Sequence, residues 1–124
     1  MTASNNVLIS IASNHEAQQH LAQGIAMLRE HIHQMELTQE LWTTPVNSLS
    51  SQQYLNQLVR GTTPHDEGTL NRLLKEIEYC CGRRPEDKTT GRVVLDLDIL
   101  AFNGQRRHLN DWNREYVKRL LQEF

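Results

Sequence analysis

The stretch GRVVLDLDILAFNG, residues 91–104, has the apolar character of a β-strand but carries two acidic residues in its middle. Side chains two positions apart on a strand share a face, so Asp96 and Asp98 are expected to point the same way. The aliphatic residues that alternate with them then face the core. Asn103-Gly104, at the end of the stretch, predicts a tight hairpin turn. The two carboxylates are therefore expected to lie side by side on one face of a strand whose other face is buried.

Hydrophobic periodicity predicts further elements on both sides of this stretch. We expect a strand over 7–12, followed by a helix over about 16–34 with N-cap chemistry from Ser13-Asn14. Strands over 35–42 and 53–61 come next, and then a helix that opens at Thr63-Pro64 and ends at Gly82. After the aspartate strand we expect a last helix, capped by Asn110, that carries Trp112, Tyr116, Leu120, Leu121 and Phe124. The order βαββαβ with a terminal helix is that of a ferredoxin-like α+β domain, a mainly antiparallel sheet with helices packed on it. We expect residues 1–124 to form this one domain. Because this architecture hosts many functions, the function must be argued from the site.

Composition excludes several classes of protein. The chain has 124 residues, 23% of them charged, and a formal net charge of −2, as in a folded soluble protein without a basic field for nucleic acid. No apolar run approaches the roughly 20 residues that cross a bilayer, and no basic leader precedes the first strand. The adjacent Cys80 and Cys81 are poorly placed to bridge each other and fit a reducing compartment. We expect a cytoplasmic protein that binds neither nucleic acid nor membrane.

The carboxylate pair has two interpretations. A solvated strand face is the ordinary one, but aspartate is depleted in strands and adjacent like charges oppose folding. A divalent cation removes this conflict, because Mg²⁺ takes one or two carboxylates and completes its shell with water and phosphate oxygens. The preceding loop carries Arg83, Arg84, Lys88 and Arg92. Guanidinium groups bind phosphate bidentately, although a solvated basic loop is the alternative. Together, the cations and carboxylates suggest a nucleoside triphosphate.

A second pair of residues suggests a pocket for a flat heterocycle. Tyr54 and Asn56 are two apart on one predicted strand, so they share a face. An aromatic plane stacks on a ring, and an amide donates and accepts hydrogen bonds at the edge of the ring. The ordinary alternative for the tyrosine is packing. Glu78, on the helix that ends at Gly82, is by default a solvated residue.

Five motifs resemble those of the 6-hydroxymethyl-7,8-dihydropterin pyrophosphokinase family of the folate pathway in order and spacing. They are ISIASN (9–14), LWTTP (41–45), QYLNQLV (53–59), LLKEIEYCCGR (73–83) and GRVVLDLDIL (91–100). The resemblance implies a ferredoxin-like α+β fold and a transferase that moves a pyrophosphoryl group from ATP to the pterin hydroxymethyl and releases AMP. It implies ATP and a dihydropterin as substrates and two Mg²⁺ ions as cofactors. We expect a short member of the family, truncated at the C-terminus.

The resemblance also implies roles for individual residues. Asp96 and Asp98 are implied metal ligands and, with Arg83 and Arg92, catalytic residues. The implied pterin-binding residues are Thr44, Pro45, Tyr54, Asn56 and Tyr116, and the implied ATP-binding residues are Glu78, Arg83, Arg92, His108 and Arg114. The polar, glycine-flanked loop over 83–91 is a candidate lid over ATP.

The sequence departs from the family pattern at three places. Ala12 replaces the glycine of the usual Gly-Ser-Asn, the loop before Arg92 lacks the usual tryptophan and proline, and Leu109 replaces a proline. These departures leave open a diverged relative that binds a pterin or nucleotide without turnover. Because the fold is common, an unrelated ferredoxin-like regulatory or interaction module is the second alternative.

Overall fold

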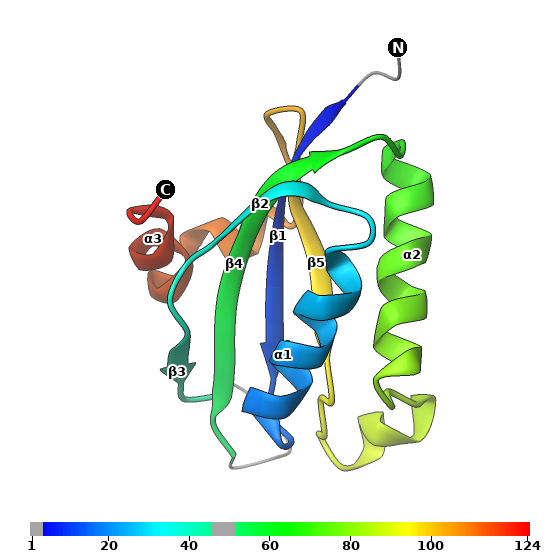
Figure 1. The fold of residues 1–124 in the computed structure, drawn as a ribbon. Coiled ribbons are helices and arrows are strands. Elements are labelled where there is room, and N and C mark those ends of the chain that lie inside the picture. Colours follow the sequence, from blue (N-terminus) through cyan, green and yellow to red (C-terminus); the bar gives the residue numbers. More distant parts are fainter. Residues whose placement is uncertain (1–3, 46–51) are drawn as a thin grey trace.

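A computed structural model describes residues 4–45 and 52–124, and within these ranges one antiparallel sheet forms the centre of the fold (Figure 1). Its strands are β1 (Asn5–Ser13), β2 (His33–Leu37), β3 (Leu41–Thr43), β4 (Tyr54–Thr63), β5 (Asp96–Phe102) and β6 (Gln105–Arg106). The strand order is β2-β4-β1-β5-β6, and β3 pairs with β4. The helices are α1 (Ala17–Leu28), α2 (Glu67–Cys80) and α3 (Glu115–Leu121), with 3₁₀ turns at Pro85–Thr89 and Leu109–Asn113. The predicted α+β class and ferredoxin-like element order are confirmed.

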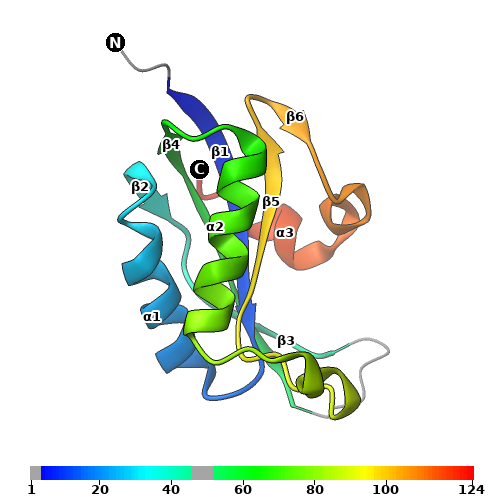
Figure 2. The same cartoon turned by 90° about the vertical axis from the view of Figure 1, so that its right-hand side faces the viewer.

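The helices divide between the two faces of the sheet (Figure 2). Helices α1 and α2 cover one face, and α3 lies against the other. The larger apolar cluster joins α1 and α2 to alternate residues of β1, β4 and β5. A smaller cluster lies under α3 and is built on Leu58, Leu100, Val117 and Leu120. Because α3 is short, it covers only part of its face, and the remainder of that face is available for a site.

The first helix and the strand after it differ from the expectation. Helix α1 ends at Leu28 rather than near residue 34, but the apolar period continues because Ile32, beyond the helix, is also buried in the core. The predicted strand over 35–42 is two strands, β2 and β3. Thr38 separates them: its Oγ1 accepts a hydrogen bond from Leu58 N at 3.0 Å. A side-chain oxygen thus interrupts the regular ladder between this segment and β4.

The predicted N-terminal signals of α1 and α2 are wrong, and the predicted end of α2 is confirmed. Ser13-Asn14 does not cap α1, whose first residues have no side-chain cap. Helix α2 is capped by Asp66, which accepts a hydrogen bond from Thr69 N at 2.7 Å, rather than opened by Thr63-Pro64. At its other end, Gly82 has φ 111° and the amides of residues 82 and 83 bond back to Tyr79 and Glu78. This is a Schellman ending, which needs the left-handed conformation that glycine adopts without strain.

The C-terminal part contains the predicted turn but a shorter helix than expected. Asn103 and Gly104 have φ values of 50° and 80°, as a two-residue type I′ hairpin turn requires, and they join β5 to β6. Helix α3 begins at Glu115 rather than after Asn110, and Trp112 lies in the preceding 3₁₀ turn. Among the described residues, no helix combines the length and apolarity that a bilayer span requires.

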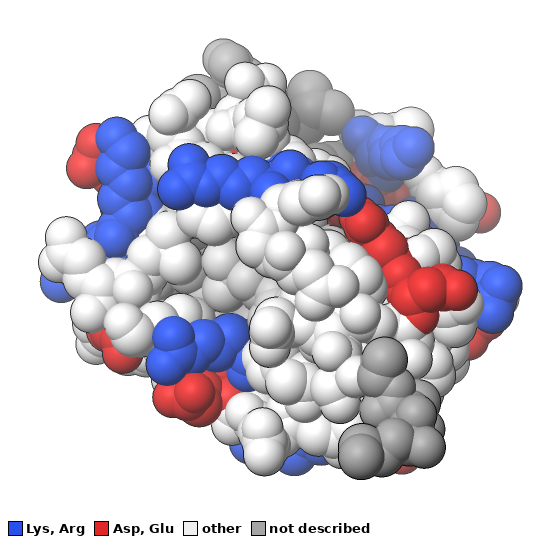
Figure 3. Space-filling model, turned by 90° about the horizontal axis from the view of Figure 1, so that it is seen from above, with Lys and Arg blue, Asp and Glu red and all other residues white. Residues whose placement is uncertain are grey.

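Surface charge is mixed on the face seen from above in Figure 3. Lysine and arginine side chains there lie in small groups, interspersed with acidic residues and separated by uncharged surface. No extended field of one sign covers the described part of this face.

Candidate active site

A cavity of about 670 Å³ opens on the side of the sheet that carries α3. Its wall is formed by Ser10, Ala12, Thr43, Thr44, Pro45, Tyr54, Asn56, Val93, Asp96, Asp98, Asp111, Arg114, Glu115 and Tyr116. Eight of the twelve site residues predicted from the sequence line it. The cavity therefore joins residues from β1, β3, β4, β5 and the C-terminal helix.

The strand register explains why this part of the sheet is hollow. Ala12, on the central strand, pairs with Asp96 on one side and with Asn56 on the other. Adjacent strands are about 4.8 Å apart, so the strands of Asp96 and Asn56 are separated by roughly 10 Å. The methyl group of Ala12 and the hydroxymethyl group of Ser10 leave the space between these strands unfilled. Small side chains on β1 thus form the floor, with carboxylates on one side and an amide on the other.

The carboxylates of Asp96 and Asp98 lie on the cavity side of β5, whereas the neighbouring Leu95 and Leu97 are fully buried. The predicted shared face is therefore confirmed by the geometry. Burial, reinforced by the charge of Asp96, raises the pKa of Asp98 to about 6. His108 opposes this shift, with its Nε2 at 3.8 Å from Asp98 Oδ1. An ionised pair here is electrostatically strained and favours a bound cation.

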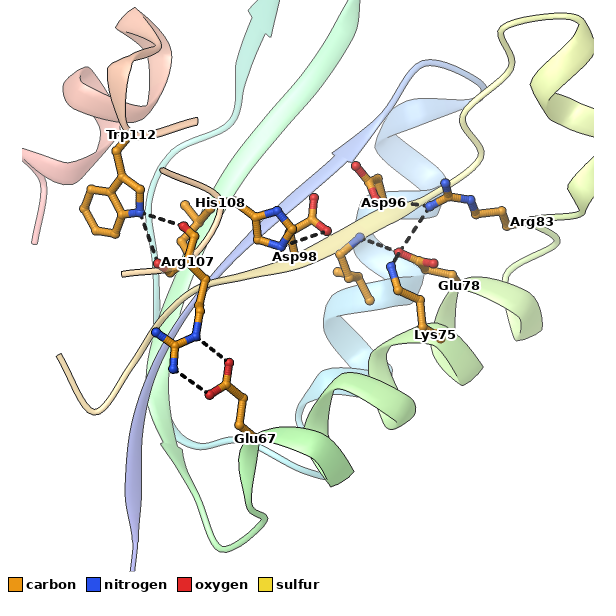
Figure 4. A network of polar contacts seen from close by, with 11 residues as sticks. Glu67, Lys75, Glu78, Arg83, Asp96, Asp98, Arg107, His108 and Trp112 are labelled. Carbon is orange, nitrogen blue, oxygen red and sulfur yellow. Dashed lines mark hydrogen bonds and ion pairs between the residues drawn. The ribbon is translucent and has the colours of Figure 1, made fainter. Parts of the chain in front are cut away.

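Arg83 and Glu78 form a network beneath Asp96 (Figure 4). Arg83 Nη1 lies 3.1 Å from Asp96 Oδ1 and 3.2 Å from Glu78 Oε2, and it donates to Leu95 O at 3.1 Å. Glu78 is only 3% exposed, and its Oε2 also accepts a hydrogen bond from Leu97 N at 2.8 Å. Burial raises the pKa of Glu78, while the Leu97 amide and the nearby cations oppose the rise. The ordinary interpretation of Glu78 as a solvated residue is thus wrong. Glu78 holds the guanidinium of Arg83 and the start of β5.

The five residues proposed for the pterin all lie on the cavity wall: Thr44, Pro45, Tyr54, Asn56 and Tyr116. Asn56 is 3% exposed, and its Nδ2 donates to Thr43 Oγ1 at 2.8 Å, to Leu41 O at 3.1 Å and to Tyr54 O at 3.2 Å. Within residues 4–45 and 52–124 its Oδ1 has no hydrogen-bond donor. The amide group is therefore oriented by β3 and β4, and its oxygen is left without a donor among these residues.

The remaining candidates are placed less uniformly. Arg114 lines the cavity, with Nε at 3.4 Å from Asp111 Oδ1, and it opposes the burial that raises the pKa of Tyr116. His108 belongs to a neighbouring cavity of about 420 Å³ at the start of α2. Arg92 is exposed, and its side chain has no polar partner in the part of the chain that the structure describes.

Sequence reasoning missed the residues that hold the wall near α3. Trp112 Nε1 donates to Leu100 O at 3.1 Å and to Arg107 O at 3.0 Å, and Arg107 forms a two-point ion pair with Glu67 at 2.9 and 3.0 Å (Figure 4). Leu100 is the unpaired residue of a β-bulge on β5, opposite the Leu8/Ile9 step of β1. Its carbonyl accepts a backbone hydrogen bond from Arg107 N at 2.8 Å as well as the bond from the indole, so its partners come from outside the pairing of β1 with β5. The indole was assigned to the apolar face of a helix, and no local pattern indicated this bond.

The carboxylate pair fits magnesium. Among the described residues, no cluster of three or more histidine, cysteine or acidic side chains could enclose a metal ion. Mg²⁺ does not require such a cage, because it commonly takes one or two carboxylates, keeps several waters and binds substrate phosphates. Asp96 and Asp98, half-buried at the cavity wall, provide that donor set.

Comparison with known proteins identifies the family. No curated protein matches the chain. The profile of the family described as 7,8-dihydro-6-hydroxymethylpterin-pyrophosphokinase (HPPK) matches residues 8–124, which is nearly the whole sequence. Members are ATP-dependent transferases of folate biosynthesis and in general use ATP and Mg²⁺. This result argues against an unrelated interaction module and agrees with the resemblance of the five motifs. The chain belongs to the 7,8-dihydro-6-hydroxymethylpterin-pyrophosphokinase family.

Proposed function

We propose that this protein transfers the pyrophosphoryl group of ATP to the hydroxymethyl group of 6-hydroxymethyl-7,8-dihydropterin and releases AMP. The observation that carries the proposal is the composition of one cavity, in which an oriented amide and two tyrosines lie opposite a pair of carboxylates. A flat heterocycle and a metal-bound polyphosphate need these two kinds of wall. Their separation of roughly 10 Å across two strand spacings leaves room for the reacting groups between them.

The pterin end depends on the direction of the Asn56 amide. Because its Nδ2 is committed to β3 and β4, only Oδ1 is left, so Asn56 accepts a hydrogen bond from an N–H at the ring edge. Tyr54 and Tyr116 offer aromatic surface for the ring faces, and Thr44-Pro45 closes the side of the pocket. A buried acceptor of this kind discriminates strongly against rings that lack the matching donor.

The phosphate end depends on Asp96 and Asp98, which would hold magnesium, two ions in our proposal. Magnesium bound there supplies charge neutralisation for the ATP phosphates. The Arg92 guanidinium has no polar partner among the described residues, and we assign it to the transferring group. Arg83 is held by Glu78 and Asp96, so it orients a metal ligand as well as offering charge to phosphate. His108 and Arg114 are assigned to the nucleotide.

The chemical step needs no side-chain nucleophile. The hydroxymethyl oxygen attacks the β-phosphorus of ATP and gives up its proton to solvent as the new O–P bond forms. The bond from the β-phosphorus to the oxygen that it shares with the α-phosphorus breaks, so that AMP leaves. The protein orients the two substrates and stabilises the charge on the transferring oxygens. Both cysteines are free, which suits the reducing cytoplasm where we place the protein.

Measurement of AMP tests the proposal. Purified protein with ATP, magnesium and the dihydropterin should produce AMP and the pyrophosphorylated pterin in equal amounts, and omission of the pterin should stop both. The second candidate function, a relative that binds without turnover, is motivated by the loop that lacks the usual tryptophan and proline before Arg92. Calorimetric binding of pterin and a magnesium-ATP analogue without AMP formation would favour it. If neither the pterin nor the ATP analogue binds, both candidate functions are contradicted.

A further inference from the structure

Asn14, immediately after β1, is a buried amide with all of its polar contacts directed at one distant loop. It is 4% exposed. Its Nδ2 donates to Gly91 O at 2.9 Å, and its Oδ1 accepts a hydrogen bond from Val93 N at 2.7 Å. Its backbone amide donates to Val93 O at 2.9 Å. Asn14 was expected to help cap α1, and in the structure it instead joins the end of β1 to the segment before β5.

The two side-chain bonds enclose Arg92. The Gly91 carbonyl belongs to the peptide group before Arg92, and the Val93 amide belongs to the peptide group after it. One side chain therefore holds both peptide groups that flank this arginine, in the pattern that a residue of a neighbouring parallel strand would use. Ser13 adds a weaker bond, with Oγ at 3.3 Å from Val93 O. Gly91 itself has φ 74°, a conformation that suits glycine and turns the chain at this point.

The rest of the loop needs such an anchor. Its first residue, Arg83, is fixed by Glu78 and Asp96, but the 3₁₀ turn Pro85–Thr89 has no buried residue. The Arg92 side chain is exposed and has no polar partner among the described residues. Its guanidinium is therefore directed by its backbone alone, and the backbone is held by Asn14. Preorganised charge stabilises a transition state only when its position is fixed before the reaction.

We infer that Asn14 is a positioning residue that fixes the Gly91–Val93 backbone and through it directs the Arg92 guanidinium toward the transferring phosphate. This inference rests on the proposed function, in which Arg92 carries transition-state charge. It assigns to Asn14 an effect on the chemical step without contact between Asn14 and either substrate.

A double-mutant cycle tests the coupling. Asn14→Ala should lower kcat by about 10- to 100-fold, the range that misplacement of a distant group can cause, with little change in KM for ATP. In the Arg92→Ala background the same change should lower kcat by no more than about 3-fold, because the guanidinium is already absent. If the loss of kcat in the double variant equals the product of the losses in the two single variants, the inference is overturned and Asn14 has a purely structural role. A silent Arg92→Ala would also overturn it, because nothing would remain to be positioned.

Amide hydrogen exchange gives a readout that does not depend on activity. The Val93 amide should be protected in the wild-type protein and should exchange much faster in Asn14→Ala, while the Leu97 amide, held by Glu78, should keep its rate. Asn14→Asp is the matched variant. It keeps the acceptor for Val93 but faces Gly91 O with a second oxygen, so Val93 should stay more protected than in Asn14→Ala. If the wild-type protein transfers no pyrophosphoryl group, the proposed function fails. Unchanged Val93 exchange in a folded Asn14→Ala would then overturn the inference separately.

Discussion

Replacement of Asp98 by asparagine should make the metal-free protein more stable and remove its activity. The side chain keeps its shape and loses its charge. In the wild-type protein that charge is half-buried next to Asp96, and burial with like-charge repulsion raises the pKa of Asp98 to about 6. We propose that function requires the charge to hold magnesium, whereas folding is better without it. The two effects of one substitution therefore have opposite signs.

The magnitude follows from the pKa of the folded state. A rise from 3.8 to about 6 corresponds to about 3 kcal/mol at about 1.4 kcal/mol per pKa unit. Because the folded state binds the proton of Asp98 more tightly than the unfolded state does, protonation of Asp98 stabilises the fold. This contribution to the free energy of unfolding is fully present below pH 4, is lost between pH 4 and 6, and stays lost above pH 6. Asparagine forfeits the attraction of His108, so we expect a gain of about 1–3 kcal/mol in the free energy of unfolding at pH 8. The gain should vanish near pH 4.

Urea denaturation in EDTA at both pH values measures this difference through the midpoint, provided that the m-value is unchanged. Asp96→Asn is the matched control, because Asp96 forms an ion pair with Arg83 and its replacement removes a favourable contact. That variant should gain nothing or be destabilised. Magnesium should stabilise the wild-type protein and neither variant. A metal-free Asp98→Asn that is less stable than wild type at pH 8, or that retains wild-type transfer, would refute the reasoning.

Three further results are expected. Asn56→Ala should weaken pterin binding by about 1–3 kcal/mol in calorimetry and leave ATP-analogue binding nearly unchanged. Thr43→Val, which removes one acceptor for the Asn56 amide, should weaken pterin binding less, and equal losses of affinity for both ligands in Asn56→Ala would indicate a folding defect. Arg92→Ala should slow single-turnover transfer by about 100-fold or more. The Arg84 guanidinium stacks on Tyr79 at 3.8 Å, so Arg84→Ala should not slow transfer, and the reverse result would place the charge donor at Arg84. Asp66→Ala should lower the free energy of unfolding by about 1 kcal/mol in urea denaturation through loss of the α2 cap, with kcat unchanged.

Most of the fold could be predicted because it depends on the local periodicity of hydrophobic residues and on turn-forming residues. The alternation that surrounds Asp96, the Asn103-Gly104 turn and the glycine that ends α2 each depend on a few neighbouring residues. The errors lie where an apolar period continues through a change of structure. Ile32 remains buried after α1 has ended, so hydrophobicity alone could not mark the boundary.

The candidate site could be predicted in its residue types but not in the hydrogen bonds that orient them. Strand parity placed Tyr54 and Asn56 on one face, and the register with Ala12 then brought that face opposite Asp96. The burial of Glu78 could not be anticipated, because its partner is the amide of Leu97, a contact that depends on how α2 packs on β5. Contacts of this kind join residues distant in sequence and leave no periodic signal.

The two arginines at the ends of the 83–92 loop differ in contacts of this kind. Both were assigned to phosphate on the same grounds, yet Arg83 is committed to two carboxylates and Arg92 has no polar partner among the described residues. A guanidinium that already neutralises Asp96 changes little when charge develops on a substrate, unless it first gives up that contact. A free guanidinium on a fixed backbone offers its full charge at that moment. We therefore propose Arg92 as the main charge donor and Arg83 as the residue that orients the carboxylate beside it.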